Sequence, residues 1–369
     1  MGVFLPFMSI WLSWRGMTTL EITILLSAPS FIRFLATPII GLWSDTKADH
    51  RIALLWGSWI AVLASIILPF AGEFLSFLLL IIILQLATHS LIPITEAKSL
   101  AGAQKLGVNY GSMRLWGSLS FISANIIGGL VIKVCGNESI SAMLVATSIS
   151  ILFAAYLLPN NPECGRTQPS NFQAGLRSIK ILLSEKWFLL LLISTGMIQS
   201  SHATYYVLGT LHWRSKGISD EWIGILWALG VIMEAGLFFI SNRLLERYSS
   251  IGLIVIGGLS AIARWTIMAL DPPFWALFPL QCLHALTFAA THLGTVNIIN
   301  IHIPATQSGT AQSINTALGS GALMGIMTLL SGLLYEMIHV SSYIIMAGIA
   351  GFGVIILIFM TNTIGIKRI

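Results

Sequence analysis

Apolar residues occur along this chain in long runs separated by short polar segments. A helix needs about 20 apolar residues to cross the hydrocarbon core of a bilayer, and eleven runs reach roughly that length. Their predicted bounds are 20–43, 52–70, 74–95, 111–133, 140–158, 187–211, 221–242, 251–270, 274–298, 312–335 and 343–361. The pattern therefore predicts an all-α integral membrane protein.

The segment from Gly2 to Trp14 is also apolar but is too short to cross a bilayer. It has neither the charged n-region nor the small-residue cleavage site of a signal peptide. We expect it to be the second half of a first helix, which would give the intact protein about 12 transmembrane helices. Met1 would then be a truncated or wrongly set start.

The longest polar stretch, 159–186, separates the predicted helices into two sets. We predict an N-terminal six-helix bundle over 1–158 with its first helix truncated, a cytoplasmic linker over 159–186 and a C-terminal six-helix bundle over 187–369. An internal repeat supports this division. Arg15-Gly16 aligns with Lys216-Gly217, and the same offset places Arg33 opposite Glu234.

Composition leads to the same class of protein. Hydrophobic residues make up 56% of the chain and charged residues 9%, whereas a soluble domain has about 25% charged residues. The net charge is +5, but the basic residues form no run that would bind phosphate, so we expect no nucleic-acid partner. The three scattered cysteines indicate neither a disulfide framework nor a metal site.

The distribution of Lys and Arg predicts the topology, because positive loops stay in the cytoplasm. Of the 19 basic residues, 12 fall in one alternating set of loops and 4 in the other, while Arg33, Arg114 and Arg264 lie within or at the mouth of spans. Both termini are therefore expected in the cytoplasm.

The loop after the second predicted helix begins Gly41-Leu-Trp-Ser-Asp45. It resembles the G-x-x-x-D-[RK]-x-G-[RK]-[RK] signature of the major facilitator superfamily, although the second glycine is missing. The alternative is an ordinary polar turn. In the functional interpretation, Asp45 accepts hydrogen bonds from a neighbouring helix end and holds the cytoplasmic side shut, so Gly41 and Asp45 are candidate gating residues.

Further motifs in both halves are similar to the bacterial 3-phenylpropionate permease family. They include the segments 2–7, 91–96, 110–118, 202–206, 227–231, 263–265, 283–284 and 291–293. The resemblance implies a major facilitator fold, a proton-coupled mechanism, small organic substrates such as aromatic acids, and a location in the bacterial inner membrane. Lactose permease and nucleoside symporters are related to this family, so the resemblance leaves the substrate open.

Glu234 lies well inside an apolar span, where an ionised carboxylate costs about 2.5–3.5 kcal/mol or more. It is the first candidate for the proton-carrying group. Arg264 is its candidate partner one helix later, and His284 and His292 lie near one face of the helix after that. The set resembles the coupling residues of lactose permease, without a carboxylate in the span of the histidines. The alternatives are a structural Glu–Arg pair and hydrogen-bonded packing histidines.

Three further charged residues are candidates for substrate binding. Glu96 and Arg114 stand at adjacent antiparallel helix ends and look like the substrate-binding pair of lactose permease; the alternative is a surface ion pair. Arg114 has a guanidinium that can bind a substrate carboxylate through two hydrogen bonds. Arg33, in a helix with Pro29 and Pro38, would attract an anion or else pair with a carboxylate of the other bundle.

Aromatic residues suggest a substrate wall, with packing or lipid contact as the alternative. The candidates are Trp116, His202, Tyr205 and Tyr206, with Trp11 and Trp227. Motifs for ATP hydrolysis, zinc proteolysis and serine nucleophiles are missing from the sequence, so we expect neither an enzyme nor a cofactor.

The sequence thus predicts a monomeric secondary transporter that couples protons to a small organic solute by alternating access. The alternatives within transport are a sugar or nucleoside symporter and a small-molecule exporter. A non-transporting membrane sensor with the same fold is the more remote alternative.

Overall fold

The computed structural model describes residues 1–46, 50–106, 110–158 and 179–364. For most of residues 33–50 and 90–114, and for 305, 306 and 364, it describes only the backbone. Over the described residues the chain is helical and contains no β-strand. Seven stretches among them are long and apolar enough to cross a membrane, and one of these, 307–363, covers two successive helical spans.

The first half of the chain follows the predicted spans closely. Its short first helix is α1, and the second to sixth expected spans are all present, although the helix predicted over 74–95 continues to residue 106. The elements are α1 (Phe4–Trp14), α2 (Thr19–Thr46), α3 (His50–Ile67), η1 (Leu68–Phe70), α4 (Phe74–Leu106), α5 (Tyr110–Cys135) and α6 (Ser139–Leu157). Of the expected linker, 159–178 lies outside the described residues and 179–184 is helical.

Three spans of the second half are interrupted by π-helical turns. These turns are η3 (Tyr205–Gly209), η4 (Ala285–Ala290) and η5 (Ala317–Leu323). They separate α8 (Lys186–Ser200) from α9 (Thr210–Ser215), α13 (Phe274–Cys282) from α14 (Thr291–His302), and α15 (Ala305–Thr316) from α16 (Met324–Ile338). The remaining elements are α10 (Asp220–Phe239), α11 (Ser241–Arg247), α12 (Ser250–Ala269), η6 (His339–Ser341) and α17 (Ser342–Ile364). Because π-turns often mark functional sites in helices, they direct attention to this half.

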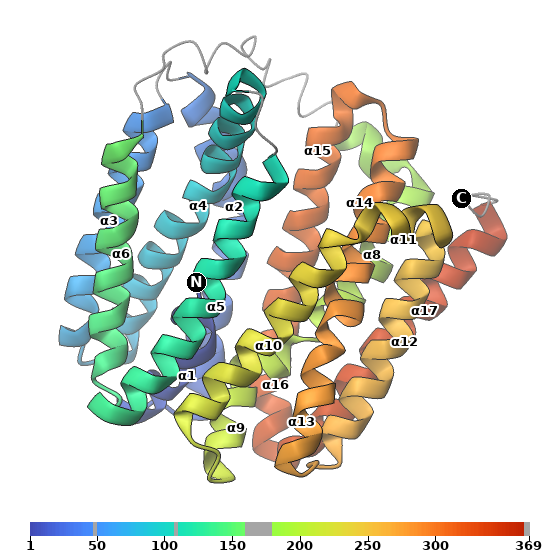
Figure 1. Cartoon of the computed structure of the whole chain (residues 1–369). Helices are drawn as coiled ribbons and strands as arrows, with labels where there is room; N and C mark the ends of the chain where they lie inside the picture. The colour runs from blue at the N-terminus through green and yellow to red at the C-terminus, as the bar shows by residue number, and fades with distance from the viewer. Residues whose placement is uncertain (47–49, 107–109, 159–178, 365–369) are drawn as a thin grey trace.

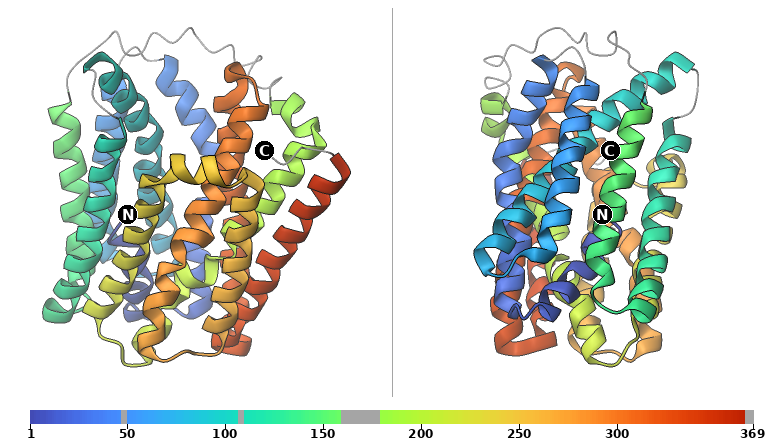
Figure 2. Two further views of the ribbon diagram at one scale, coloured as in Figure 1. Left: turned by 45° about the vertical axis from the view of Figure 1, so that its right-hand side comes forward. Right: turned by 90° about the vertical axis from the view of Figure 1, so that its left-hand side faces the viewer.

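Helices of the first half stand side by side in Figure 1, and those of the second half lie beside them, with α5 against α10 and α2 against α16. The left view of Figure 2 shows the two halves from a second direction, and in the right view the helices of the first half lie in front of those of the second. We call the end that holds the turns at 15–18 and 215–219, at the bottom of Figure 1, the closed end.

At the closed end the backbones of α5 and α10 are in contact. A Cβ built on Gly129 would meet the carbonyl oxygen of Asp220, and one built on Gly224 would meet that of Asn125. Nearby, Lys133 Nζ lies 2.6 Å from Glu221 Oε1. The lack of a side chain at Gly129 and Gly224 therefore lets these two helices approach closely.

The predicted repeat has a structural counterpart at the closed end. Gly16 and Gly217 both have positive φ, at 87° and 78°, a conformation that glycine adopts without a steric penalty. The same hydrogen bonds close both turns: Gly16 N donates to Ser13 O at 3.0 Å, and Gly217 N donates to Arg214 O at 3.0 Å. The two helix ends that are aligned in the sequence are thus built alike.

The basic residues directly before these glycines, Arg15 and Lys216, hold the two helix ends in equivalent ways. Arg15 donates to the carbonyl oxygens of Pro69 and Ala71, both at 2.6 Å. Lys216 instead forms an ion pair with Asp271, in the corresponding turn of the second half. Each basic residue therefore ties the end of one helix to a turn between two others.

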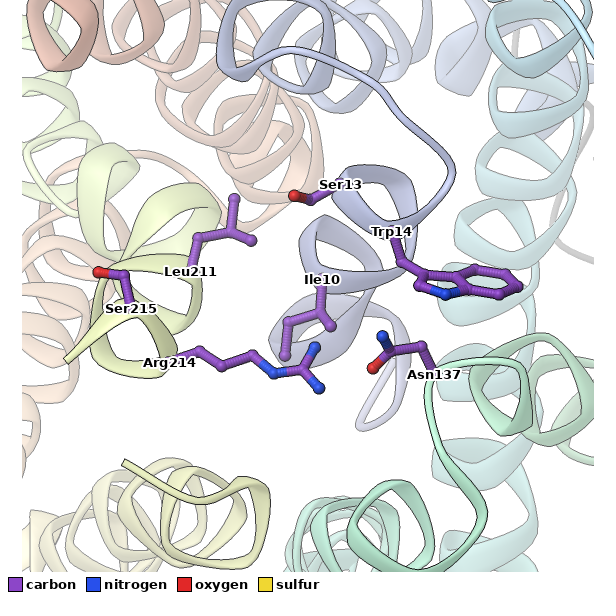
Figure 3. A pocket seen from close by; sticks show the side chains of 7 residues that line it. All are labelled: Ile10, Ser13, Trp14, Asn137, Leu211, Arg214 and Ser215. Atoms are coloured by element: carbon purple, nitrogen blue, oxygen red, sulfur yellow. The ribbon is translucent and has the colours of Figure 1, made fainter. Parts of the chain in front are cut away.

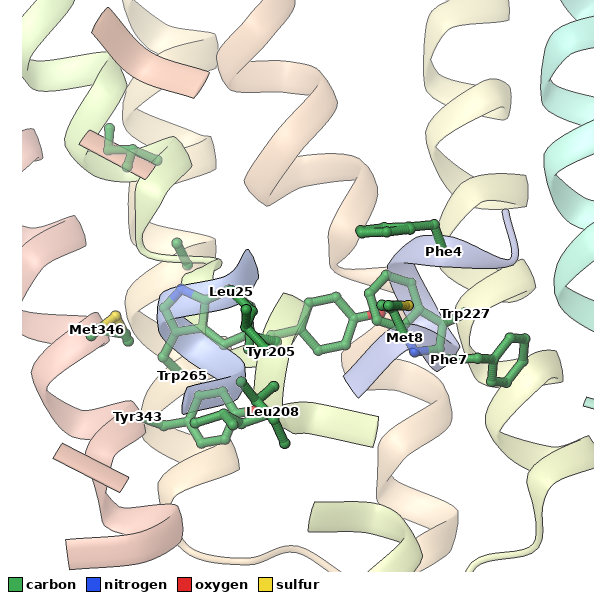
Figure 4. Packing of buried hydrophobic residues seen from close by; sticks show 14 of the residues in the cluster. Phe4, Phe7, Met8, Leu25, Tyr205, Leu208, Trp227, Trp265, Tyr343 and Met346 are labelled. Carbon is green, nitrogen blue, oxygen red and sulfur yellow. The ribbon is translucent and has the colours of Figure 1, made fainter. Parts of the chain in front are cut away.

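A continuous apolar core reaches from α1 into the second half. Figure 4 shows Phe4 and Met8 of α1 near Trp227 of α10, and Tyr205 of η3 near Trp265 of α12. Trp265 and Tyr343 stack with their ring centroids 5.8 Å apart. This core surrounds the polar residues that form the candidate site.

Candidate functional site

Arg264 of α12 lies at the centre of the site and is 0% exposed. Its Nη2 donates to Gln281 Oε1 at 3.0 Å, and its Nη1 lies 3.3 Å from Thr287 Oγ1 and 3.2 Å from His284 Nδ1. Among the described residues, these hydrogen-bond partners are all uncharged, and Arg264 Nε is buried without one. A guanidinium in this setting retains a strong electrostatic attraction for an anion.

Aromatic rings cover the faces of this guanidinium. Arg264 Cζ lies 4.9 Å from the ring centroid of Tyr205 and 4.7 Å from that of Trp265. Such cation–π contacts stabilise the buried charge without adding a counter-ion. Tyr205 also donates its hydroxyl to Gln281 Oε1 at 2.9 Å, so one amide oxygen accepts from both side chains.

His284 lies between Arg264 and Glu234. Its Nδ1 can only accept from Arg264, since a guanidinium has no acceptor, so the proton of the neutral ring is on Nε2. That nitrogen is 3.5 Å from Glu234 Oε2. The Glu234 side chain is 23% exposed, whereas that of His284 is 9% exposed. Glu234 and Arg264, which the sequence predicts as partners, are thus connected through the imidazole of His284.

A second histidine extends the polar chain. His202 Nδ1 lies 2.9 Å from the carbonyl oxygen of Gln199, and this contact requires a proton on Nδ1. His202 Nε2 then accepts from the hydroxyl of Thr287 at 2.9 Å, while Thr287 Oγ1 accepts from Arg264. The hydrogen bonds therefore run in one direction from Arg264 through Thr287 to His202, and each polarises the next.

The predicted aromatic wall is assembled around this network. Tyr205 and Trp227 stack with their ring centroids 4.7 Å apart, and Tyr206 stacks on Trp227 at 6.0 Å. Tyr206 also stacks on His202 at 5.6 Å. Tyr205 and Tyr206 belong to η3, His202 lies just before it, and Trp227 belongs to α10. The tertiary fold brings these rings together.

Three of the predicted residues lie outside this group. His292 stacks on Phe288 at 6.1 Å and meets Phe238 edge-on, one helical turn beyond the residues around Arg264. Trp116, on α5, is 71% exposed and is not among the rings that contact the described aromatic cluster. Trp11 is fully buried against Phe77.

The side chains of several predicted site residues lie outside the described part of the structure. They are Arg33, Gly41, Asp45, Glu96 and Arg114. Their helices are described: residues 33, 41 and 45 belong to α2, residue 96 to α4 and residue 114 to α5. The substrate-binding and gating roles expected for them stay predictions.

The structure adds Gln281 and Thr287 to the site, which the sequence analysis did not single out. They lie three residues before and after His284, so all three share one face of the helix. Polar residues that recur at this spacing in an apolar span are the pattern by which the sequence could have identified Gln281 and Thr287. Among the described residues, no group of three or more His, Cys, Asp or Glu side chains is placed to hold a metal ion.

Comparison with known proteins places this chain in a family. The sequence model of the MFS_1 like family matches residues 1–345. A probable 3-phenylpropionic acid transporter of Escherichia coli (strain K12) is 29% identical over 358 residues, which cover 95% of this chain and 91% of the relative. A maltose permease of Geobacillus stearothermophilus is 24% identical over 340 residues, covering 91% and 84% of the two chains.

The fold is similar to that of a solved transporter. The crystal structure of the nucleoside transporter NupG superposes with a TM-score of 0.84 at 15% sequence identity, covering 99% of this chain and 96% of the other. The family match and the shared helical architecture agree with the expectation from the sequence, and the matched relatives are transporters rather than enzymes. The chain belongs to the MFS_1 like family and is a multi-pass membrane transporter of the major facilitator superfamily.

Proposed function

We propose that this transporter is a proton symporter for a small organic solute of the aromatic carboxylic acid class. The observation that carries the proposal is the position of His284, which touches Arg264 through Nδ1 and faces Glu234 through Nε2. This arrangement connects a buried cation to a titratable carboxylate through a group that can itself take up a proton.

Protonation of Glu234 would change the charge that faces His284 without breaking the contact between His284 and Arg264. With Glu234 ionised, the Nε2 proton of His284 is directed to the carboxylate, and Nδ1 accepts from Arg264. A second proton on His284 would place an N–H of the ring against the guanidinium, and the two cations would repel each other. Protonation of Glu234 instead removes the negative charge and leaves the Arg264 contact intact, so we assign the transported proton to Glu234.

The surroundings of Arg264 support an anionic, aromatic substrate. The guanidinium has uncharged hydrogen-bond partners among the described residues, and Tyr205, Tyr206 and Trp227 supply stacked rings beside it. A carboxylate would approach the positive charge while a ring packs against the aromatic side chains. The resemblance to a probable 3-phenylpropionic acid transporter points to the same class.

In the proposed cycle, substrate binds between bundles formed by 1–158 and 187–369, and the two bundles rock to expose it to either side. The charge distribution of the loops favours cytoplasmic termini in a bacterial cell, and in this orientation the closed end would face outward. Arg33, Glu96 and Arg114 would contact the substrate, and Gly41 and Asp45 would take part in closing the cytoplasmic side. A monomer suffices for this cycle.

The test is proton-driven uptake of labelled 3-phenylpropionate into vesicles that hold the purified protein. E234Q should abolish accumulation against a gradient while exchange of internal for external substrate continues. E246Q is the matched control, because Glu246 is an exposed carboxylate on α11. Uphill uptake by E234Q at the rate of E246Q would overturn the assignment of the proton to Glu234.

A competition panel separates the alternatives. Uptake inhibited by a sugar or by a nucleoside, and not by aromatic acids, would make the protein a symporter of that other class. Efflux from preloaded vesicles without uptake would indicate an exporter. Binding without flux under every gradient would indicate a sensor.

A further inference from the structure

A recess of about 350 Å³ lies at the closed end, away from the site around Arg264. It is bordered by α1, by the turn between α5 and α6, and by α9, and Figure 3 shows it from close by. The lining residues are Ile10, Ser13, Trp14, Asn137, Leu211, Arg214 and Ser215. Its volume is at the lower end of the range for small-molecule sites, about 300–1,000 Å³.

Arg214 supplies a cation with donors to spare. Its side chain is 35% exposed, and the hydrogen bond it makes to the described residues joins Nη2 to Asp220 Oδ2 at 3.4 Å. This distance is longer than the usual range of about 2.7–3.2 Å. A guanidinium has five N–H donors, so most of them are available to a ligand. Because Asp220 already pairs with Arg214, we expect a second anion to bind weakly.

Asn137 supplies a second polar group on the opposite side. Its Oδ1 is buried and has no hydrogen-bond partner among the described residues. Figure 3 shows its amide facing the guanidinium of Arg214 across the recess. Rotation of the amide by half a turn would direct its N–H groups at an anion instead. With the amide turned in this way, an anion held between the two groups would accept a hydrogen bond from an amide N–H at the buried position where Oδ1 has no partner among the described residues.

Apolar groups complete the recess. Ile10 of α1 and Leu211 of α9 border it, and the Trp14 ring, which is 46% exposed, lies beside Asn137. A cation and an amide next to aliphatic and aromatic surface match a small organic anion with an apolar end. Inorganic anions would leave the apolar part of the recess unfilled.

We propose that this recess is a second binding site that takes a small organic carboxylate carrying an apolar group. A bound carboxylate would connect Arg214 of α9, in the second half, to Asn137 and α1 in the first half. It would therefore hold the two halves together at the closed end. The proposal goes beyond the proposed function, because it requires binding in the recess and does not depend on transport.

The native Cys135 offers a probe close to this site. It is exposed at the end of α5, two residues before Asn137. We would label it with a trifluoroethyl thiol in a protein that carries C164S and C282S, and titrate the fluorine signal with 3-phenylpropionate. The neutral 3-phenyl-1-propanol is the ligand control, R214Q and N137L are the site variants, and R243Q on the exposed α11 is the matched arginine control.

The expected result is a saturable shift with the carboxylate, at least tenfold weaker binding in R214Q and N137L, and unchanged binding in R243Q. Thermal melting of each variant checks that it is folded. Equal titrations of R214Q, N137L and the parent protein, or an equal response to the alcohol, would overturn the proposal. Failure of the proposed transport would leave the titration unaffected, because Arg214 and Asn137 line the recess and have no role in the proposed proton coupling.

Discussion

His284 Nε2 lies 3.5 Å from Glu234 Oε2, although the two residues belong to different helices and are separated by 50 positions. The other nitrogen of the ring accepts a hydrogen bond from Arg264. The imidazole is thus the physical connection between a carboxylate that is partly exposed and a guanidinium that is completely buried.

Replacement of this histidine tests the connection. In H284Q the amide oxygen can still accept a hydrogen bond from Arg264, but the flexible amide replaces the rigid ring that holds the Nε2–H group opposite Glu234. We expect proton-driven accumulation to fall at least tenfold while substrate exchange is retained. Uptake driven by a pH gradient and counterflow in the same vesicles measure the two. H302Q, on α14, is the control, and equal accumulation by both variants would contradict the expectation.

Arg264 and lysine are not interchangeable at this position. The guanidinium reaches Gln281, Thr287 and His284 in different directions, whereas an ammonium group cannot keep this fork of contacts. Each buried acceptor left unpaired costs about 1–3 kcal/mol. We therefore expect R264K to have a lower Tm and little uptake.

The matched control for that variant is R247K. Arg247 is exposed on α11 and lies over the ring of Tyr248. Melting of the detergent-solubilised proteins and uptake in vesicles compare the two changes. A Tm and an uptake rate for R264K that equal those of R247K would show that the fork of contacts is dispensable.

The closed end depends on the absence of a side chain at Gly224. A Cβ there would meet the carbonyl oxygen of Asn125, so G224A should push α10 away from α5. We expect a lower Tm and slower uptake. Gly236 on the same helix has nothing within 4 Å of its Cβ position, and G236A should raise stability by up to about 1 kcal/mol through helix propensity. Identical melting of the two variants would contradict the close packing.

Asp271 should make part of the stability depend on pH. It lies in the turn between α12 and α13, where partial burial raises the pKa of its carboxyl. Hydrogen bonds from Lys216 and His212, and their charges, lower it more, so that the pKa lies below its ordinary value. A carboxyl whose pKa is lower in the folded state stabilises the protein above the pKa of the unfolded state, and the contribution disappears as pH falls through the folded value.

The measurement is the Tm of the parent protein and of D271N between about pH 3 and pH 7. Asn also tolerates the positive φ of 52° at this position. The difference in Tm should be largest near neutral pH and should shrink toward zero at the acid end. E73Q, in the turn before α4, is the control for loss of a carboxylate in a turn, and its melting is measured over the same pH range. A D271N difference that is constant with pH would exclude the proposed linkage.

Apolar periodicity and length determined the helices of this protein. The bounds predicted for the spans agree with the structure to within a few residues in most cases, as for 251–270 against Ser250–Ala269. The reason is that backbone groups in lipid must be satisfied within each helix, so a long apolar run has few alternatives. The repeat of Arg15-Gly16 and Lys216-Gly217 was also readable, because glycine is needed where φ is positive.

The sequence by itself also selected Glu234, Arg264 and His284, since ionisable or polar groups in an apolar span must find partners. Only the tertiary structure decided which partner each one has. The tilt and rotation of the packed helices place His284 between the other two residues. They also bring Gln281 and Thr287 into contact with Arg264 and leave His292 outside the network. These contacts depend on the packing of segments far apart in the chain, including the π-turn η4 that carries Thr287, and no local pattern of residues encodes that packing.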